Sequence, residues 1–306
     1  MPLGYADPST LTNCTVETCS VYTSFYNYRI DLAANIAFLV CFSILLIVYL
    51  GIWIWKRRCH LFGIAMTLGL VIEIVGYACR IWSYYNQWIE NAYLIELICI
   101  TLAPAVFSAG IYLCLAWIVI IYGPDNSRIK PIKYTIITAQ FIPCDIFSLV
   151  LQLIGGVIAA VGLDELSLTL ITQGTDVLTA GLAWQVFTLL CFLTLCVDLA
   201  FRIRRRKRKL GDAALSQDPR AIEARASRLF LLFQIAIGLA SVLIFWRCVY
   251  RLIELNDGFD GPVTFNQGIY IGFEGVLIVI AVSALAIMHP AICMGEAITK
   301  EVPRVT

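Results

Sequence analysis

Seven apolar stretches in this sequence are each long enough to cross a lipid bilayer. A transmembrane helix needs about 20 mainly apolar residues. The chain is 60% hydrophobic and only 14% charged, whereas soluble domains are about 45–50% apolar and about 25% charged. The predicted fold class is therefore all-α, a polytopic membrane protein with seven transmembrane helices. The expected spans are 32–55, 61–82, 93–122, 134–161, 177–200, 229–250 and 268–294.

The distribution of basic residues predicts the orientation of these spans. Of the 22 Lys and Arg residues, all but Arg29, Arg80, Arg247 and Arg251 fall in segments that lie on one side of the membrane. The loops expected on the opposite side contain neither residue type. Basic loops are retained in the cytoplasm, so the amino terminus is expected outside and the carboxyl terminus in the cytoplasm.

No shift in composition divides the spans, so one transmembrane domain is expected over residues 32–294. It is preceded by an extracellular segment, 1–31, and followed by a cytoplasmic tail, 295–306. The first residues lack both a basic region and an apolar core, so no cleaved signal peptide is expected.

The largest polar segment is a basic loop, 202–228, on the predicted cytoplasmic side. It opens with the run RIRRRKRK at 202–209, and Asp218-Pro219 further on is typical of a capped helix start. The run could bind anionic lipid. The simpler interpretation, which we prefer, is that its charges only hold the loop inside.

Of the 12 cysteines, only Cys14 and Cys19 lie in the predicted outer segment. They could form a disulfide in an oxidising compartment, or remain two unpaired thiols. Asn13-Cys14-Thr15 fits the glycosylation sequon on the correct side of the membrane. A disulfide at its middle residue could hinder modification of Asn13.

Ionisable residues occur inside the apolar stretches. Glu73 and Arg80 are separated by about two helical turns, which places both side chains on one face of a helix. Asp145, Arg247 and Glu274 also lie within spans. A charge in hydrocarbon costs at least about 2.5–3.5 kcal/mol, so such groups normally face a protein interior or a wet cavity and have a function. Their expected depths, from the middle to the outer leaflet, predict a polar cavity that opens outwards.

These groups could instead form structural pairs that lock helices together, such as Arg80 with Glu73 or Arg247 with Asp145. Interhelical polar contacts in membranes contribute only about 0.6–2 kcal/mol each. Such contacts would offset little of the cost of burying so many charges, so ligand binding is the favoured interpretation.

Several signatures of other functions are missing. The sequence has no G-x-x-x-x-G-K-[ST] loop for direct ATP drive, no Gly-x-Ser-x-Gly elbow and no lysine within a span. Its two histidines, His60 and His289, are too few for a three-histidine zinc site. We therefore expect no enzyme activity, no cofactor, no metal and no nucleic-acid partner.

Motifs on successive spans resemble those of a known family, the RTA-like lipid-translocating exporters of fungi. The resemblance covers about residues 14–294, and includes Cys14-x-x-x-x-Cys19 and Tyr26-x-Tyr28-Arg29 before the first span. The motifs within the spans are Glu73-x-x-Gly76-Tyr77-x-x-Arg80, Ala103-Pro104-Ala105, Asp145-x-x-Ser148-x-x-x-Gln152-x-x-Gly155-Gly156, Gly181-Leu182-x-x-Gln185, Arg247-x-x-Tyr250-Arg251-x-x-Glu254 and His289-Pro290.

The resemblance implies a seven-span fungal protein, usually at the plasma membrane. Members are linked to movement or export of sphingoid long-chain bases, to resistance to toxic amphiphiles and, in one branch, to porphyrin uptake. This chain departs from the pattern at Ile30-Asp31, where the family usually has Pro-Ser. Gln267 and Glu274 stand where the family has two acids, and Gln267 removes one charge.

The leading hypothesis is a translocator of lipids or amphiphiles similar to a sphingoid base. The acids would hold its amine, the glutamines its hydroxyls and an apolar groove its tail. The alternatives are a seven-helix lipid receptor or sensor coupled to cytoplasmic partners, and an exporter of a secondary metabolite. The predicted substrate-binding residues are Glu73, Tyr77, Arg80, Asp145, Gln152, Gln185, Arg247, Arg251, Glu254 and Glu274.

Overall fold

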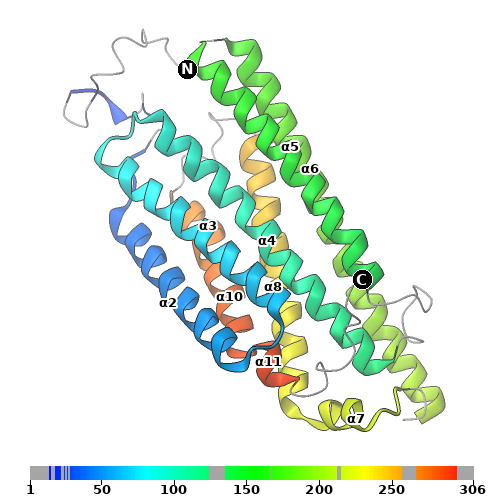
Figure 1. The fold of residues 1–306 in the computed structure, drawn as a ribbon. Coiled ribbons are helices and arrows are strands. Elements are labelled where there is room, and N and C mark those ends of the chain that lie inside the picture. The colour runs from blue at the N-terminus through cyan, green and yellow to red at the C-terminus, as the bar shows by residue number, and fades with distance from the viewer. Residues whose placement is uncertain are drawn as a thin grey trace.

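The protein is an elongated bundle of helices in a computed structural model (Figure 1). The structure describes residues 14, 18–21, 24, 26, 28–123, 135–165, 167–211, 215–256 and 267–294; for 135–139, 163 and 164 it describes the backbone alone. All regular secondary structure within these residues is helical. The predicted all-α class is thus confirmed.

Seven helical segments of the described chain are long and apolar enough to cross a membrane, as predicted. The seventh is composite: a π-helix, η4, separates the short α9 from α10, and α11 follows. A short helix, α7, connects α6 to α8. The bounds are α2 Leu32–Lys56, α3 His60–Tyr85, α4 Glu90–Tyr122, α5 Thr135–Asp164, α6 Leu168–Leu210, α7 Pro219–Ala226, α8 Arg228–Asn256, α9 Gln267–Tyr270, η4 Ile271–Val276, α10 Leu277–Ile287 and α11 Pro290–Cys293.

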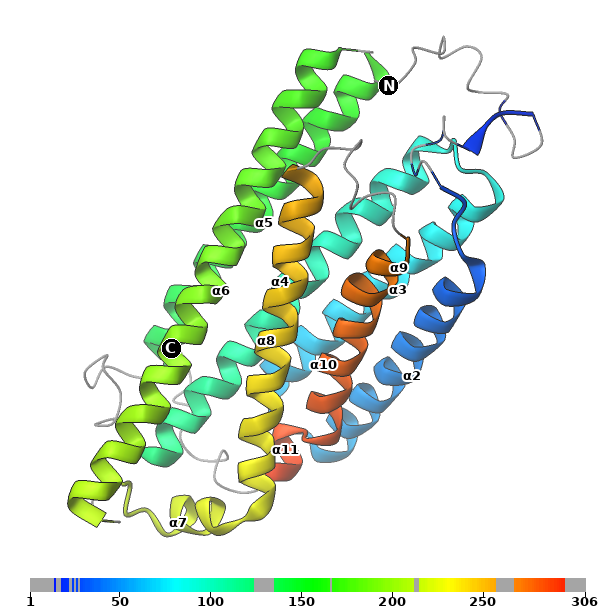
Figure 2. The same ribbon diagram turned by 180° about the vertical axis from the view of Figure 1, so that it is seen from behind.

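Helix α4 lies at the centre of the bundle. In its most apolar window 72% of the residues are buried, against 22% for α2 and for α6. Helices α3 and α5 pack against opposite sides of α4, and α8 packs against it from behind (Figures 1 and 2). Helix α2 packs on α3, α6 pairs with α5, and α10 lies between α8 and α2. We call the end where α2 begins the amino-terminal end, and the end where α6 finishes the basic end.

Helices α5 and α6 touch through their backbones. A Cβ atom added at Gly155 would lie 2.4 Å from the backbone nitrogen of Leu178, and one added at Gly174 would lie 2.3 Å from that of Ala159. Only residues without a side chain permit this approach, which is the usual role of small residues in membrane helix pairs. The two helices therefore form a tight hairpin.

Helix α6 is longer at both ends than the predicted span 177–200. Its 43 residues extend over about 64 Å at 1.5 Å per residue, roughly twice the hydrocarbon core. The run 202–209, predicted to be loop, is in fact the last turns of this helix. Lys and Arg are good helix formers and favour a helix carboxyl end, and Arg202 pairs with Asp198 one turn earlier at 3.1 Å.

The predicted helix start at Asp218 is confirmed. A carboxylate oxygen of Asp218 accepts the backbone N–H of Arg220 at 3.0 Å, and Pro219 is the first residue of α7. An acidic cap followed by proline is a strong local signal because it depends on adjacent residues alone.

Candidate functional site in the bundle interior

The ionisable and polar residues predicted inside the spans are enclosed by the helices. Their exposed fractions do not exceed 5%, apart from Glu254, whose side chain is 11% exposed. The predicted cavity opening outwards is therefore not observed among the described residues. The enclosed residues are Glu73, Tyr77, Arg80, Asp145, Gln152, Gln185, Arg247, Arg251 and Glu274.

Arg80 forms an ion pair with Glu96 of α4, not with Glu73. Glu73 lies two turns away on the same helix, about 10 Å along its axis, whereas Glu96 faces Arg80 across the α3–α4 contact. Arg80 also donates to the hydroxyl of Tyr28 at 2.7 Å and lies 3.9 Å from the ring centre of Tyr270. Sequence analysis missed Glu96, although an acid inside the predicted span 93–122 was a visible signal.

The segment before α2 is anchored to this ion pair. The hydroxyl of Tyr26 donates to Glu96, and the side chain of Gln87 donates to the backbone oxygen of Tyr28 at 3.0 Å. Burial, the largest cause, raises the pKa of Tyr26, which keeps its hydroxyl protonated as a donor. The segment is thus held by buried polar contacts against the last turns of α3 and the first turns of α4, at the amino-terminal end of the bundle.

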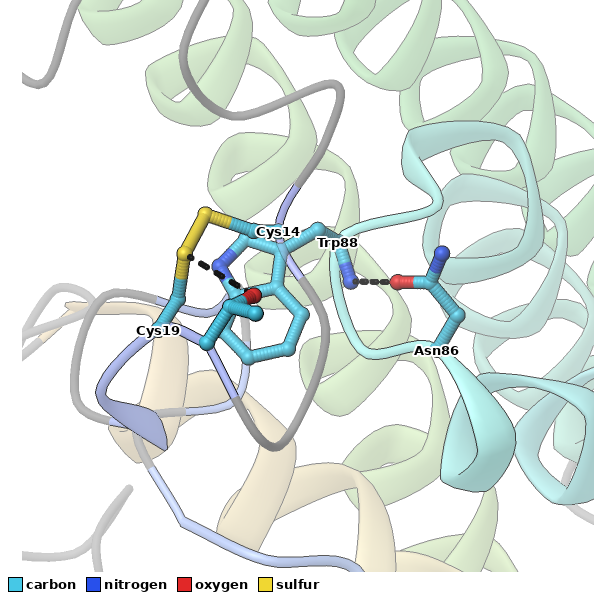
Figure 3. The surroundings of a disulfide bond; sticks show 5 residues. Cys14, Cys19, Asn86 and Trp88 are labelled. Atoms are coloured by element: carbon cyan, nitrogen blue, oxygen red, sulfur yellow. Dashed lines mark hydrogen bonds between the residues drawn. A yellow bond between two sulfur atoms is a disulfide. The ribbon is translucent and has the colours of Figure 1, made fainter.

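A disulfide joins Cys14 to Cys19, with their Cα atoms 5.4 Å apart. Asn86 and Trp88, from the connection between α3 and α4, belong to its surroundings (Figure 3). The predicted glycosylation site, Asn13, lies outside the described residues.

Replacing Tyr26 by phenylalanine is expected to loosen the segment before α2. The change removes a hydrogen bond to a charged group, which contributes about 1.5–3 kcal/mol, so protease cleavage of this segment should be roughly ten-fold faster or more. Limited proteolysis of the purified protein measures this rate. Tyr85→Phe is the matched control, because Tyr85 is 69% exposed. Equal rates for the two variants would contradict the role given to the Tyr26 hydroxyl.

A second ionic group joins α8 to the π-helix η4. Arg247 pairs with Glu274 at 2.7 Å, and not with Asp145 as one interpretation of the sequence allowed. Arg251, one turn later, lies 2.6 Å from Glu254 and 3.4 Å from Glu274. Interruptions of this kind in a helix are often found at functional sites.

Arg247 also bonds to the backbone of α4. Its guanidinium donates to the carbonyl oxygen of Ile100. In a regular helix that carbonyl would accept the N–H of residue 104, but Pro104 has none. Arg247 therefore satisfies an acceptor that the proline leaves free, which links α8 directly to α4.

A third group connects α4, α5 and α6 without any cation. Asp145 accepts hydrogen bonds from Ser108 at 2.9 Å, Tyr112 at 2.9 Å and Thr188 at 3.0 Å. Two turns along α5, the amide of Gln152 donates to that of Gln185 at 2.8 Å. The motif residues of α5 and α6 thus face each other.

Glu73 differs from the other buried acids of the interior, and Tyr77 lies beside it. Among the residues that the structure describes, neither carboxyl oxygen of Glu73 nor the hydroxyl of Tyr77 has a hydrogen-bond partner, although the two residues are only 1% and 0% exposed. They lie one turn apart on the same face of α3. Buried polar atoms are nearly always paired, so this unpaired couple is the strongest candidate for contact with a ligand.

The fold and its interior define a seven-span membrane protein built around buried ion pairs. Comparison with known protein families matches residues 66–297 to the family described as RTA1 like protein. The chain belongs to this family, which confirms the assignment from its motifs.

The chain is 32% identical over 296 residues to the sphingoid long-chain base transporter RSB1 of Saccharomyces cerevisiae, covering 90% of this chain and 76% of that protein. It is also similar to protein RTA1 of the same yeast, at 25% identity over 229 residues, 75% of this chain and 66% of that one. Protein RTM1, again of this yeast, is 26% identical over 218 residues, which cover 71% and 64% of the two chains. No solved structure matches. These relatives support membership of a lipid transporter family.

Proposed function

We propose that this protein translocates a lipid or amphiphile similar to a sphingoid long-chain base. The observation that carries the proposal is the unpaired carboxyl of Glu73 beside the unpaired hydroxyl of Tyr77, enclosed within the bundle. The similarity to a sphingoid long-chain base transporter supports the choice of substrate class.

The chemistry of the substrate suits this couple. A sphingoid base carries a primary ammonium, which has three N–H donors and no acceptor, as in lysine. The carboxyl oxygens of Glu73 and the hydroxyl of Tyr77 are acceptors within one helical turn of each other. Asp145, Gln152 and Gln185, on α5 and α6, would take the substrate hydroxyls.

The remaining predicted residues would shape the path of the substrate through their ion pairs. Each already has a charged partner, so it holds helices in place around the path and offers less to a ligand than Glu73 does. This group comprises Arg80, Arg247, Arg251, Glu254 and Glu274.

The proposal extends to the orientation and location of the protein. With the amino terminus outside, the Cys14–Cys19 disulfide lies in an oxidising compartment, and Asn13 is on the side where glycosylation occurs. The plasma membrane is the location that suits efflux and resistance to toxic amphiphiles. The run 202–209 would then meet the anionic lipid of the cytoplasmic leaflet.

Substituting Glu73 by glutamine or Asp145 by asparagine should slow the movement of labelled long-chain base about ten-fold or more. Each change removes one carboxylate contact to the substrate, and ten-fold corresponds to about 1.4 kcal/mol. The measurement is flux into proteoliposomes that contain only the purified protein, at matched protein abundance. Glu223→Gln, on the exposed face of α7, is the matched control. Unchanged flux in both site variants would refute these roles.

A lipid receptor or sensor is the second candidate, because the described structure encloses its polar groups. Tight binding of the base to purified protein without flux in proteoliposomes would favour this function over translocation. Export of a secondary metabolite is a third candidate. A position of the gene beside a biosynthetic gene cluster would support it.

A further inference from the structure

The buried charges near Glu73 are balanced without it. Arg247 and Arg251 are two cations, and Glu274 and Glu254 are the two acids that lie against them at 2.6–3.4 Å. The Arg80–Glu96 pair is likewise neutral. Glu73 is an additional acid beside a set that already sums to zero.

The groups that face Glu73 supply no partner for a carboxylate. On α8 and η4 the charges close enough to act on it are those of Arg247 and Glu274, which are bonded to each other. On α4 the ionisable group within electrostatic range is the thiol of Cys99. On α3 itself the neighbour is Tyr77. The centre of its ring lies 5.3 Å from the ring centre of Phe38 and 5.5 Å from that of Phe42, both on α2.

An ionised carboxylate in this position would be buried and without a hydrogen-bond donor, near the charges of Arg247 and Glu274, which already neutralise each other. Burial of a charge is tolerated only when it is paired and hydrogen-bonded; otherwise the group takes up a proton. Asp145 is equally buried but has three hydroxyl donors. Glu73 has none.

We propose that Glu73 carries a proton in this closed arrangement and exchanges it for the ammonium group of the lipid substrate. The inference rests on the proposed function and adds a coupling ion to it. The exchange is balanced: the protonated carboxyl and the ammonium become a carboxylate–ammonium pair and one free proton. The net charge inside the bundle is the same before and after.

This exchange gives transport a source of energy. If a proton enters the site from one side of the membrane and the base from the other, each proton that moves down its gradient expels one base in the opposite direction. The site never holds an unneutralised charge, because proton and ammonium compete for the same carboxyl.

The experiment counts the protons released when the base binds. A short-chain sphingoid base, added as its ammonium salt to the purified full-length protein in weakly buffered detergent near neutral pH, should release about one proton per molecule bound. Glu73→Gln should release none, and Glu73→Asp should still release one. Glu223→Gln on α7 is the control and should behave as the unmodified protein.

A second measurement tests the resting proton without any ligand. Infrared spectra of the unmodified protein should contain a carbonyl band of a protonated carboxylic acid that Glu73→Gln lacks. Base binding without proton release would overturn the exchange and leave the proposed function standing. Absence of base binding would instead refute the proposed function. Identical infrared spectra would overturn the resting proton whatever the ligand result.

Discussion

Replacing Glu274 by glutamine is expected to lower the stability of the folded bundle by about 3–5 kcal/mol, the usual cost of removing one partner of a buried ion pair. Arg247, which is 1% exposed, would lose the carboxylate to which it is bonded. The effect should be visible as a large fall in the thermal unfolding temperature of the purified protein in detergent.

The same chemical change at Glu73 is the internal control. Because Glu73 has no partner and we expect it to be neutral, Glu73→Gln should leave the unfolding temperature nearly unchanged. The double variant Arg247→Met, Glu274→Gln should recover part of the loss, since it removes both charges. Equal destabilisation by the two single glutamine variants would contradict this division between structural and ligand-binding acids.

Replacing Gly155 by alanine should separate α5 from α6. The added methyl group would lie 2.4 Å from the backbone nitrogen of Leu178, which cannot rotate away as a side chain could. Overpacking of this kind costs about 1–3 kcal/mol, and transport should fall with it if the hairpin contributes to the substrate path. Thermal unfolding and flux measure the two effects.

The adjacent residue provides the control for this prediction. A methyl group at Gly156 would meet only the side chains of Ile98 and Leu178, the nearest atom being 3.6 Å away, which is ordinary contact. Gly156→Ala should therefore be tolerated, with a gain of at most about 1 kcal/mol from the higher helix propensity of alanine. Similar losses from both substitutions would show that the backbone contact at Gly155 is not what holds the hairpin.

The sequence predicted those features that depend on local patterns. Apolar length located all seven spans, and the adjacent Asp218 and Pro219 located the start of α7. The end of α6 was not predicted, because a hydropathy criterion ends a span at the first charges, whereas Arg202 and the basic residues after it continue the helix beyond the apolar region.

The partners of the buried charges could not be read from the sequence. Spacing along one helix suggested Arg80 with Glu73, but pairing depends on which helices touch, and the α3–α4 contact brings Glu96 to Arg80 instead. The sequence predicted that these residues lie inside the bundle, and most of them are indeed buried. The division of the buried acids into those with a partner and Glu73, which has none among the described residues, required the structure.

The bond from Arg247 to the carbonyl of Ile100 restricts how this protein can change shape. Prolines in membrane helices often act as hinges, since the missing N–H weakens the helix at that point. Here the guanidinium of Arg247 takes the place of the absent donor. Bending α4 at Pro104 or withdrawing α8 would therefore leave the buried carbonyl of Ile100 without a hydrogen bond. We therefore expect α4 and α8 to move as one rigid body, and alternating access to depend on the helices that flank this fixed pair.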